Sequence, residues 1–290
     1  MIDIKDIQIE KDRGYKACIA EANGLLLGNI KTIFKRTWIS TAVCALATAI
    51  LMSCFFSELY DGSKISSVFT TAASLFTVGA QVAYMAQVYG LINGQKMKRN
   101  VLRYAILTAC YIGISFIVSM GLTTSLYLYT KTHPVTVETF WVFGGIYFAT
   151  TLAVTAILLP YAYATTKYML DGKCSLGAML TKSYRIGIRH WGFIFITLLL
   201  TMLCAYLCCA LVSLPMLIVL FANTLSFLGV TNIGDPAGLP EYFPMLRFAV
   251  VALFSFVCLY INMFVVFVCC FMYGSIEAKE KGKKASKAEL

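Results

Sequence analysis

The chain has 290 residues, of which 59% are hydrophobic and only 13% are charged, whereas soluble domains carry roughly 25% charged residues. A soluble protein of this composition would expose large apolar patches and aggregate, so the composition excludes an ordinary soluble globular protein. The formal net charge is +10. The basic residues flank long apolar stretches, which is a pattern of membrane topology, so we expect no nucleic-acid partner.

The N-terminal segment, 1–36, has two patterns. Ile2, Ile4, Ile7 and Ile9 predict a short strand or an extended arm over the first ten residues. Over 15–36 the apolar residues instead recur at intervals of three and four, while the lysines fall elsewhere on the helical wheel. This spacing predicts an amphipathic helix at the cytoplasmic membrane surface.

Six apolar stretches follow, and each reaches or exceeds the roughly 20 residues needed to cross a hydrocarbon core of about 30 Å. They cover 37–56, 68–92, 102–129, 140–168, 191–222 and 243–273. No Asp, Glu, Lys, Arg or His lies near the middle of any stretch, although such residues usually mark ion paths or active sites in membranes. We therefore expect an all-α polytopic membrane protein with six transmembrane helices in three hairpins. The domains would be a cytoplasmic segment 1–36, a transmembrane domain 37–276 and a basic tail 277–290.

The second apolar stretch carries a polar stripe. Its members recur at spacings of four and three, which places them on one helix face: Thr70, Ser74, Thr77, Gln81 and Tyr84. Asn262 is the most polar residue of the sixth stretch. Two interpretations stay open, namely a polar-lined path between helices, or packing through interhelical hydrogen bonds. The amides of Gln81 and Asn262 need partners when buried, so we expect both near any cavity.

A second basic amphipathic helix is predicted before the fifth stretch, at 176–189. Leu176, Leu180, Tyr184 and Ile188 form its apolar stripe. Its basic residues and those before the first stretch together predict a surface for anionic lipid headgroups or for a membrane or cytoplasmic partner protein. That surface comprises Lys31, Lys35, Arg36, Lys182, Arg185 and Arg189.

Proline and glycine mark three further positions. Pro160 and Pro215 predict kinks in the fourth and fifth stretches. The connection 223–242 contains Gly234 followed by Asp235 and Pro236, which argues against a continued helix there. It is either a partly embedded external cap or an ordinary loop.

The distribution of lysine and arginine predicts the orientation. Of the 24 such residues, only Lys64, Lys131 and Arg247 fall on one side of the six-span arrangement. Because positively charged segments stay in the cytoplasm, we expect both termini to be cytoplasmic.

The sequence gives little support for catalysis, metal binding or cofactor binding. The cluster Cys204, Cys208 and Cys209 has neither the spacing nor the His or carboxylate partners of a zinc site. The two histidines, His133 and His190, have no nucleophile and carboxylate arranged near them in the sequence. No phosphate-binding loop or hydrolase motif is present. We expect no catalytic residue, no metal and no cofactor.

A basic helix followed by two spans occurs twice, with Arg36-Thr37-Trp38 and Arg189-His190-Trp191 at the boundaries. This pattern resembles bacterial six-span membrane proteins of unknown role, and it is similar in outline to the membrane domain of some glycerophosphodiester phosphodiesterases. The catalytic domain of those enzymes is missing from the chain, so the resemblance does not imply their activity.

The sequence thus predicts a non-catalytic integral membrane protein that serves as a binding, assembly or accessory component, with the lipid bilayer as its first partner. The alternative is a small permease for a neutral or amphipathic solute, which would cross through the hydroxyl-lined interior. Proton-coupled transport is disfavoured because charged residues are missing from the middle of the apolar stretches.

Overall fold

The structure, a computed structural model, describes residues 8–60, 67–132, 137–234 and 239–288. Within these ranges the only regular secondary structure is helical, and six helices are long and apolar enough to cross a membrane. The prediction of an all-α protein with six membrane-spanning helices is confirmed at this level. The chain forms two compact units, one built from 1–101 with 197–290 and the other from 102–196.

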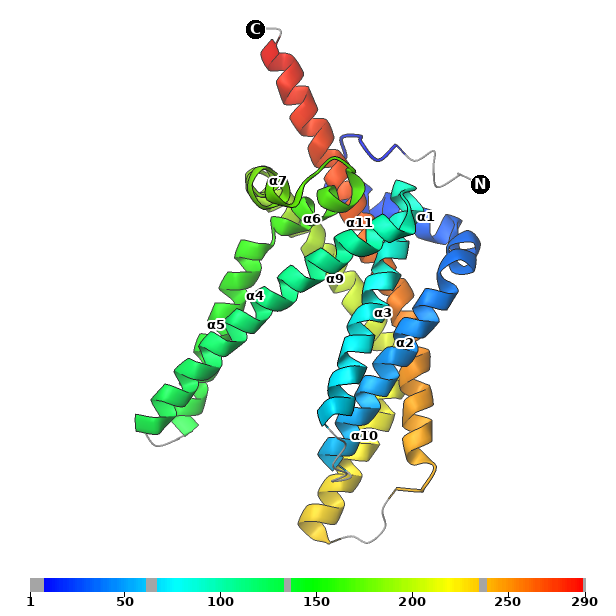
Figure 1. Cartoon of the computed structure of the whole chain (residues 1–290), viewed down its shortest axis with the longest axis vertical. Coiled ribbons are helices and arrows are strands. Elements are labelled where there is room, and N and C mark those ends of the chain that lie inside the picture. Colours follow the sequence, from blue (N-terminus) through cyan, green and yellow to red (C-terminus); the bar gives the residue numbers. More distant parts are fainter. Residues whose placement is uncertain (1–7, 61–66, 133–136, 235–238, 289–290) are drawn as a thin grey trace. The chain divides into compact units, whose positions relative to one another are not determined.

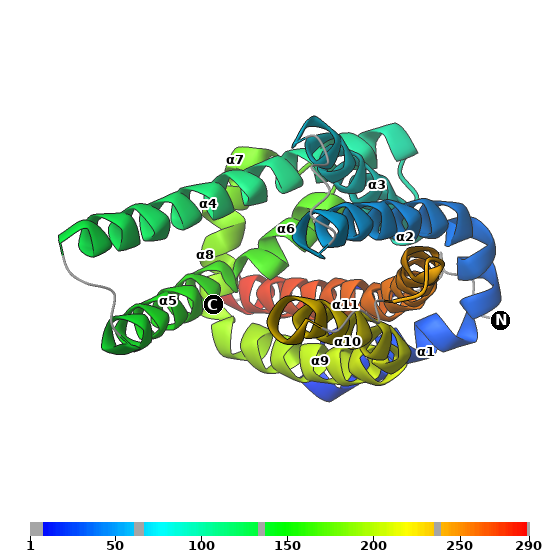
Figure 2. The same ribbon diagram turned by 90° about the horizontal axis from the view of Figure 1, so that it is seen from below.

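The first unit contains α1 (Tyr15–Gly28), α2 (Ile30–Tyr60), α3 (Ser67–Asn93), α10 (Leu214–Leu228), the π-helical turn η3 (Gly229–Ile233) and α11 (Phe243–Ala288). Most of α9 (Trp191–Val212) also belongs to it. Helix α2 lies between α3 and α11 and packs along both (Figures 1 and 2). Ala45, Ala47 and Ala49 are buried on α2, and such small residues let neighbouring helices approach closely.

The predicted helix over 15–36 is two helices, because the chain bends at Asn29. The buried side chain of Asn29 donates a hydrogen bond from Nδ2 to the Leu25 carbonyl (3.2 Å), and its backbone leaves the helical region at φ −119°, ψ 15°. A side-chain bond of this kind competes with the helical backbone bonds. Residues 30–36 consequently form the beginning of the first span helix. Helix α1 packs on α11 and buries Cys18, Ala22 and Leu25.

The second unit contains most of α4 (Met97–Thr132) with α5 (Val137–Leu158), α6 (Tyr161–Leu170), α7 (Leu176–Ala178), the π-helical turn η2 (Met179–Ser183) and α8 (Tyr184–Arg189). Arg103 of α4 binds the end of α6. Its guanidinium donates to the carbonyls of Asp171 (2.9 Å), Gly172 (2.8 Å) and Cys174 (3.2 Å) and to that of Tyr168. One arginine thus satisfies a carbonyl of the last turn of α6, which has no intrahelical donor, and three carbonyls of the turn that follows the helix.

The predicted fourth span, 140–168, is interrupted at Pro160. Because Pro160 has no N–H group, the carbonyl of Ala156 cannot accept its helical bond. Trp191 supplies the missing donor through its indole Nε1 (3.2 Å), and the Tyr184 hydroxyl donates to the next carbonyl, Ile157 (3.0 Å). Helix α5 therefore ends at Leu158, and the break is held by the residues that follow α7.

Two other predicted boundaries differ from the structure. The fifth span is divided at Ser213 into α9 and α10, with Pro215 near the start of α10, where its missing N–H is tolerated. The predicted connection 223–242 is helical as far as Ile233, and Gly234 ends it with a φ of 70°, a conformation that glycine adopts without strain. The predicted tail 277–290 continues α11 to Ala288, because its Ala, Glu and Lys residues are good helix formers. The arrangement in three hairpins stays a prediction.

Candidate functional site

The polar stripe of α3 connects helices within the first unit. Thr77 Oγ1 donates to the Ala47 carbonyl of α2 (3.1 Å), and the Tyr84 hydroxyl donates to the Leu259 carbonyl of α11 (2.6 Å). Tyr84 is fully buried, and Ser74 bonds within its own helix to the Thr70 carbonyl (2.9 Å). These bonds favour the packing interpretation of the stripe over a polar path.

The two amides that we expected near a cavity, those of Gln81 and Asn262, lie on the surface of their helices. Gln81 and Asn262 are both exposed, and Asn262 Nδ2 donates to the Cys258 carbonyl one turn earlier in α11 (3.0 Å). The structure therefore does not bring these two amides together in a buried polar centre.

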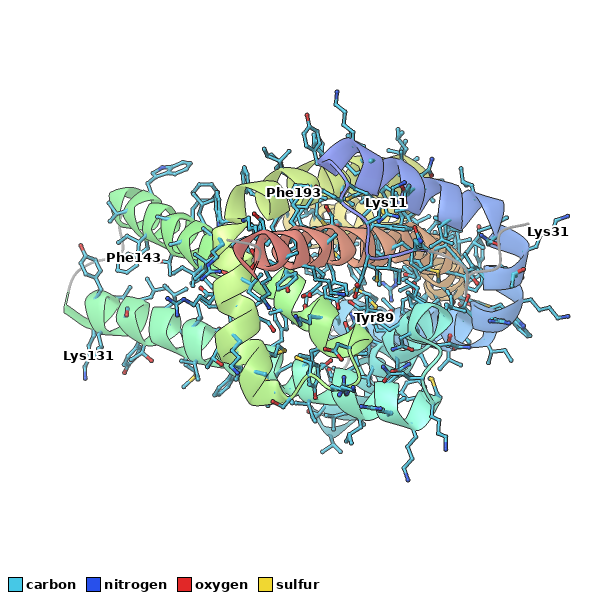
Figure 3. All side chains as sticks on the ribbon, turned by 90° about the horizontal axis from the view of Figure 1, so that it is seen from above. Lys11, Lys31, Tyr89, Lys131, Phe143 and Phe193 are labelled. Atoms are coloured by element: carbon cyan, nitrogen blue, oxygen red, sulfur yellow. The ribbon has the colours of Figure 1, made fainter. Side chains whose placement is uncertain are left out.

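All six basic residues of the predicted surface are exposed, but they belong to different units. Lys31, Lys35 and Arg36 lie in the first two turns of α2, and Figure 3 shows Lys31 extending outward from the helix. Lys182 lies in η2, and Arg185 and Arg189 lie in α8. Each group is an exposed basic surface of its own.

The segment 176–189 buries a different face from the one that its sequence predicts. Met179, Ser183 and Gly187 are buried, and η2 and α8 pack on α6. Gly187 is required for this contact, because a Cβ there would lie 2.7 Å from the Pro160 carbonyl oxygen. Leu180 and Ile188 of the predicted apolar stripe are 43% and 51% exposed. The segment thus presents apolar and basic residues together on its outer surface.

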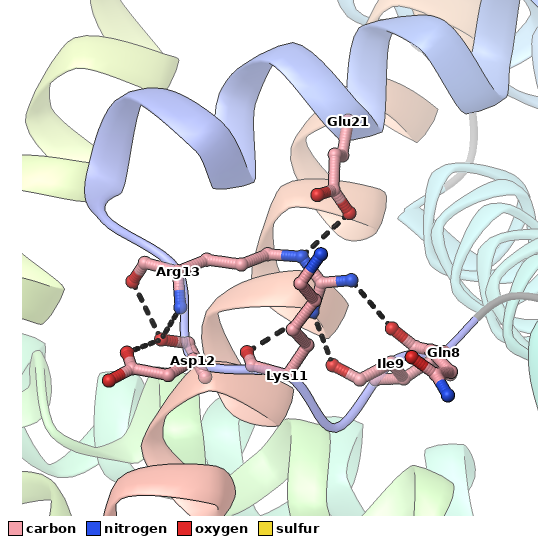
Figure 4. A network of polar contacts seen from close by, with 7 residues as sticks. Gln8, Ile9, Lys11, Asp12, Arg13 and Glu21 are labelled. Atoms are coloured by element: carbon pink, nitrogen blue, oxygen red, sulfur yellow. Dashed lines mark hydrogen bonds and ion pairs between the residues drawn. The ribbon is translucent and has the colours of Figure 1, made fainter.

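Sequence reasoning missed a polar junction between the N-terminal segment and α11 (Figure 4). The buried Arg13 side chain forms an ion pair with Glu21 of α1 (2.6 Å) and donates to the carbonyls of Gln8 (2.6 Å) and Ile9 (2.8 Å). These contacts fold residues 8–14 into a compact arm.

The arm is joined to α11 by bonds in both directions. The Arg13 amide donates to Ser275 Oγ (3.0 Å), which in turn donates to the Arg13 carbonyl (2.7 Å). Lys279 pairs with Asp12 (3.4 Å), and Lys281 pairs with Glu10, whose hydrogen bond and charge raise the pKa of Lys281. No local signal predicts these contacts, because the partners are more than 260 positions apart.

A pocket at the other end of α11 was also missed. It has a volume of about 280 Å³ and lies between α10 with η3 and the first turns of α11, and its lining includes Asn223, Ser226, Glu241 and Arg247. The sequence signal was an arginine inside an apolar stretch. Its partner Asn223, 24 positions earlier, cannot be identified from spacing alone.

Titratable side chains give no candidate metal centre among the described residues. No cluster of three His, Cys, Asp or Glu side chains that could hold a metal ion occurs there. His133 and Asp235, which the sequence analysis considered, lie outside the described residues. All eleven cysteines are free thiols.

Comparison with known proteins gives no match: no protein-family model fits the chain, and neither a curated protein nor a solved structure is significantly similar to it. The resemblance to the membrane domain of glycerophosphodiester phosphodiesterases therefore stays a prediction.

Proposed function

We propose that the chain is a non-catalytic integral membrane protein of a bacterial inner membrane, where it acts as a binding, assembly or accessory component. In this proposal both termini are cytoplasmic, and the exposed basic segments bind anionic lipid headgroups beside the bundle. The observation that carries the proposal is the outer surface of 176–189, where Leu180 and Ile188 are exposed in the same short segment as the basic side chains.

Physical chemistry supports a membrane-surface role for this segment. An exposed apolar stripe beside a basic stripe is typical of helices that lie in the headgroup region, with apolar residues toward the acyl chains. The segment is held in place by Gly187 and Ser183 packing on α6, so its exposed faces are available to lipid. Three hydroxyls of the α3 stripe that a permease would need for a polar path, those of Ser74, Thr77 and Tyr84, are instead bonded to helix carbonyls, so we prefer the accessory role.

The test measures retained lipid by native mass spectrometry of the full chain, reconstituted in equal amounts of phosphatidylglycerol and phosphatidylcholine. The double variant Lys182→Gln/Arg185→Gln should lose phosphatidylglycerol selectively. Each basic residue near an anionic surface contributes about 1 kcal/mol, so about 2 kcal/mol of binding free energy would be lost.

The matched control is Lys283→Gln/Lys284→Gln, which removes two exposed charges from the end of α11, away from the apolar stripe. This variant should retain lipid like the unmodified protein. Equal loss of phosphatidylglycerol in both variants would show that net charge alone determines lipid binding, and it would contradict the proposed surface. In a separate measurement, native mass spectrometry of the protein extracted gently from its own membrane would reveal a stoichiometric second polypeptide, whose identity would indicate the process that the protein assists.

A further inference from the structure

The pocket at the start of α11 has the features of a binding site. It is formed entirely within the first unit, at the start of α11, whereas Ser275 and its contacts with the arm lie farther along the same helix. Phe227, Val230 and Phe243 supply apolar lining, and the polar lining residues are Asn223, Ser226, Glu241 and Arg247. A small molecule with one polar end fits this combination of walls.

Two buried side chains set the polarity of the pocket. Arg247 is 2% exposed, its guanidinium carbon lies 5.1 Å from the centre of the Phe56 ring, and its Nη1 donates to Asn223 Oδ1 (3.2 Å). Because the amide oxygen accepts from the arginine, the orientation of the Asn223 side chain is fixed and its NH2 group remains as a donor.

That donor lacks an acceptor within the part of the chain that the structure describes. Asn223 is 6% exposed, and its Nδ2 has no hydrogen-bond partner among those residues. A buried polar group without a partner costs about 1–3 kcal/mol, so an acceptor supplied by a ligand would be favourable. The Ser226 hydroxyl also lines the pocket, and the first turn of α11 adds the positive end of a helix dipole.

We propose that this pocket binds a small amphipathic acid, with its carboxylate or phosphate group accepting from Asn223 and facing Arg247 and its apolar part against Phe227 and Val230. The carboxylate of Glu241, which is exposed on the lining, disfavours multiply charged anions. The same oxygen-anion chemistry comes from a free acid or from the headgroup of an anionic lipid. This inference is independent of the lipid-binding surface proposed above for 176–189, which lies in the other unit.

The test uses the purified full chain in a neutral detergent, with hexanoate and phosphatidylglycerol as acidic probes. Hexanol and phosphatidylcholine are the matched probes without net charge. Calorimetric titration should detect binding of at least one acidic probe and much weaker binding of its counterpart. Hexanoate binding identifies a free acid, and binding of phosphatidylglycerol alone identifies a lipid headgroup.

The decisive variant is Asn223→Asp. The aspartate keeps an oxygen that can accept from Arg247, so the variant should fold. It replaces the NH2 donor with a negatively charged oxygen. Since a hydrogen bond to a charged group contributes about 1.5–3 kcal/mol, binding of the acidic probe should weaken about ten- to hundredfold. The control Asn232→Asp places the same charge on an exposed residue of η3 that does not line the pocket, and it should leave binding unchanged.

Two results would overturn the proposal: no acidic probe binds the unmodified chain, or Asn223→Asp binds it as tightly. If the Asp variant fails to fold, Ser226→Ala provides the test instead, with an expected weakening of about two- to tenfold from one lost neutral hydrogen bond. Unchanged acid binding by a folded Ser226→Ala protein would then contradict the proposed site.

Discussion

Gly274 lies in close contact with the arm. A Cβ at this position would overlap the Ile9 carbonyl oxygen and lie 2.8 Å from the Ile9 Cγ2 atom. The next residue, Ser275, makes the two bonds to Arg13. The arm therefore depends on a residue with no side chain beside a residue with a small hydroxyl.

We predict that Gly274→Ala detaches the arm and exposes Cys18 of α1. Overpacking of this kind costs about 1–3 kcal/mol. Cys18 is fully buried, and burial raises its pKa from 9.0 to about 11, so at pH 8 it carries about a hundredfold less of the reactive thiolate than an exposed thiol. Alkylation at pH 8, with Cys18 identified by peptide mass spectrometry, should be much faster in the variant.

Gly282→Ala is the matched control, because this glycine lies in the same helix with no atom near its would-be Cβ. It should leave Cys18 protected, and equal alkylation rates in both alanine variants would contradict a role for the close contact.

The raised pKa of Cys18 also determines how the stability of the protein changes with pH. The unfolded chain loses the Cys18 proton first, so the contribution of this group to stability decreases as pH rises from about 9 toward 11.

The residue-scale contacts were the least predictable from sequence. The Arg13–Ser275 and Asn223–Arg247 pairs join residues 262 and 24 positions apart. Composition identifies which residues prefer to be buried, but the partner of a buried polar group is decided by packing. Helical spacing also fails to predict burial: Gln81 is exposed, although it is spaced to share a helix face with Thr77 and Tyr84.

At the scale of elements, the break at Pro160 is predicted by a local rule, but the hydrogen-bond donor that compensates for it comes from a residue distant in the sequence. Proline predicted the kink, and the helix is interrupted there as expected. Trp191, which by sequence is a boundary tryptophan, is also the donor that satisfies the Ala156 carbonyl. The periodicity of 176–189 gave the helical structure correctly. It failed to identify the buried face because Gly187 and Ser183 allow a closer approach to α6 than the leucines do.

We predict that Gly187→Ala loosens the packing of α8 on α6. Its Cβ would lie 2.7 Å from the Pro160 carbonyl oxygen and 2.9 Å from the Pro160 Cβ, and neither atom can move without moving the backbone. A destabilisation of about 1–3 kcal/mol should lower the thermal unfolding midpoint. Gly177→Ala, in the same segment but with open space around it, should leave that midpoint unchanged or raise it slightly. If both variants unfold alike, the contact does not stabilise the unit.

At the scale of the whole molecule, composition was the strongest predictor. Six apolar stretches in the sequence correspond to six helices able to span a membrane, because a lipid environment requires each span to satisfy its own backbone. The ends of these helices were predicted less well. Breaks at Asn29 and Ser213 and the extension of α10 to η3 depend on side-chain bonds and helix caps, which hydropathy does not measure.

The arm and the charge distribution together predict the topology. Because residues 8–14 bond directly to Ser275 and Lys279, we predict that both ends of the chain lie on one side of the membrane, which requires an even number of crossings. The charge distribution then predicts which side this is, since Lys64, Lys131 and Arg247 are the only lysines or arginines on the opposite side in the six-span arrangement.

A green fluorescent protein fused after Leu290 should therefore fluoresce in the cytoplasm, and alkaline phosphatase fused after Lys131 should be active outside it. An active phosphatase at the C-terminus would reverse the orientation and remove the basic surface of 176–189 from the cytoplasmic leaflet. Opposite locations for the two termini would be incompatible with the bonds between the arm and α11, whichever way the charges point.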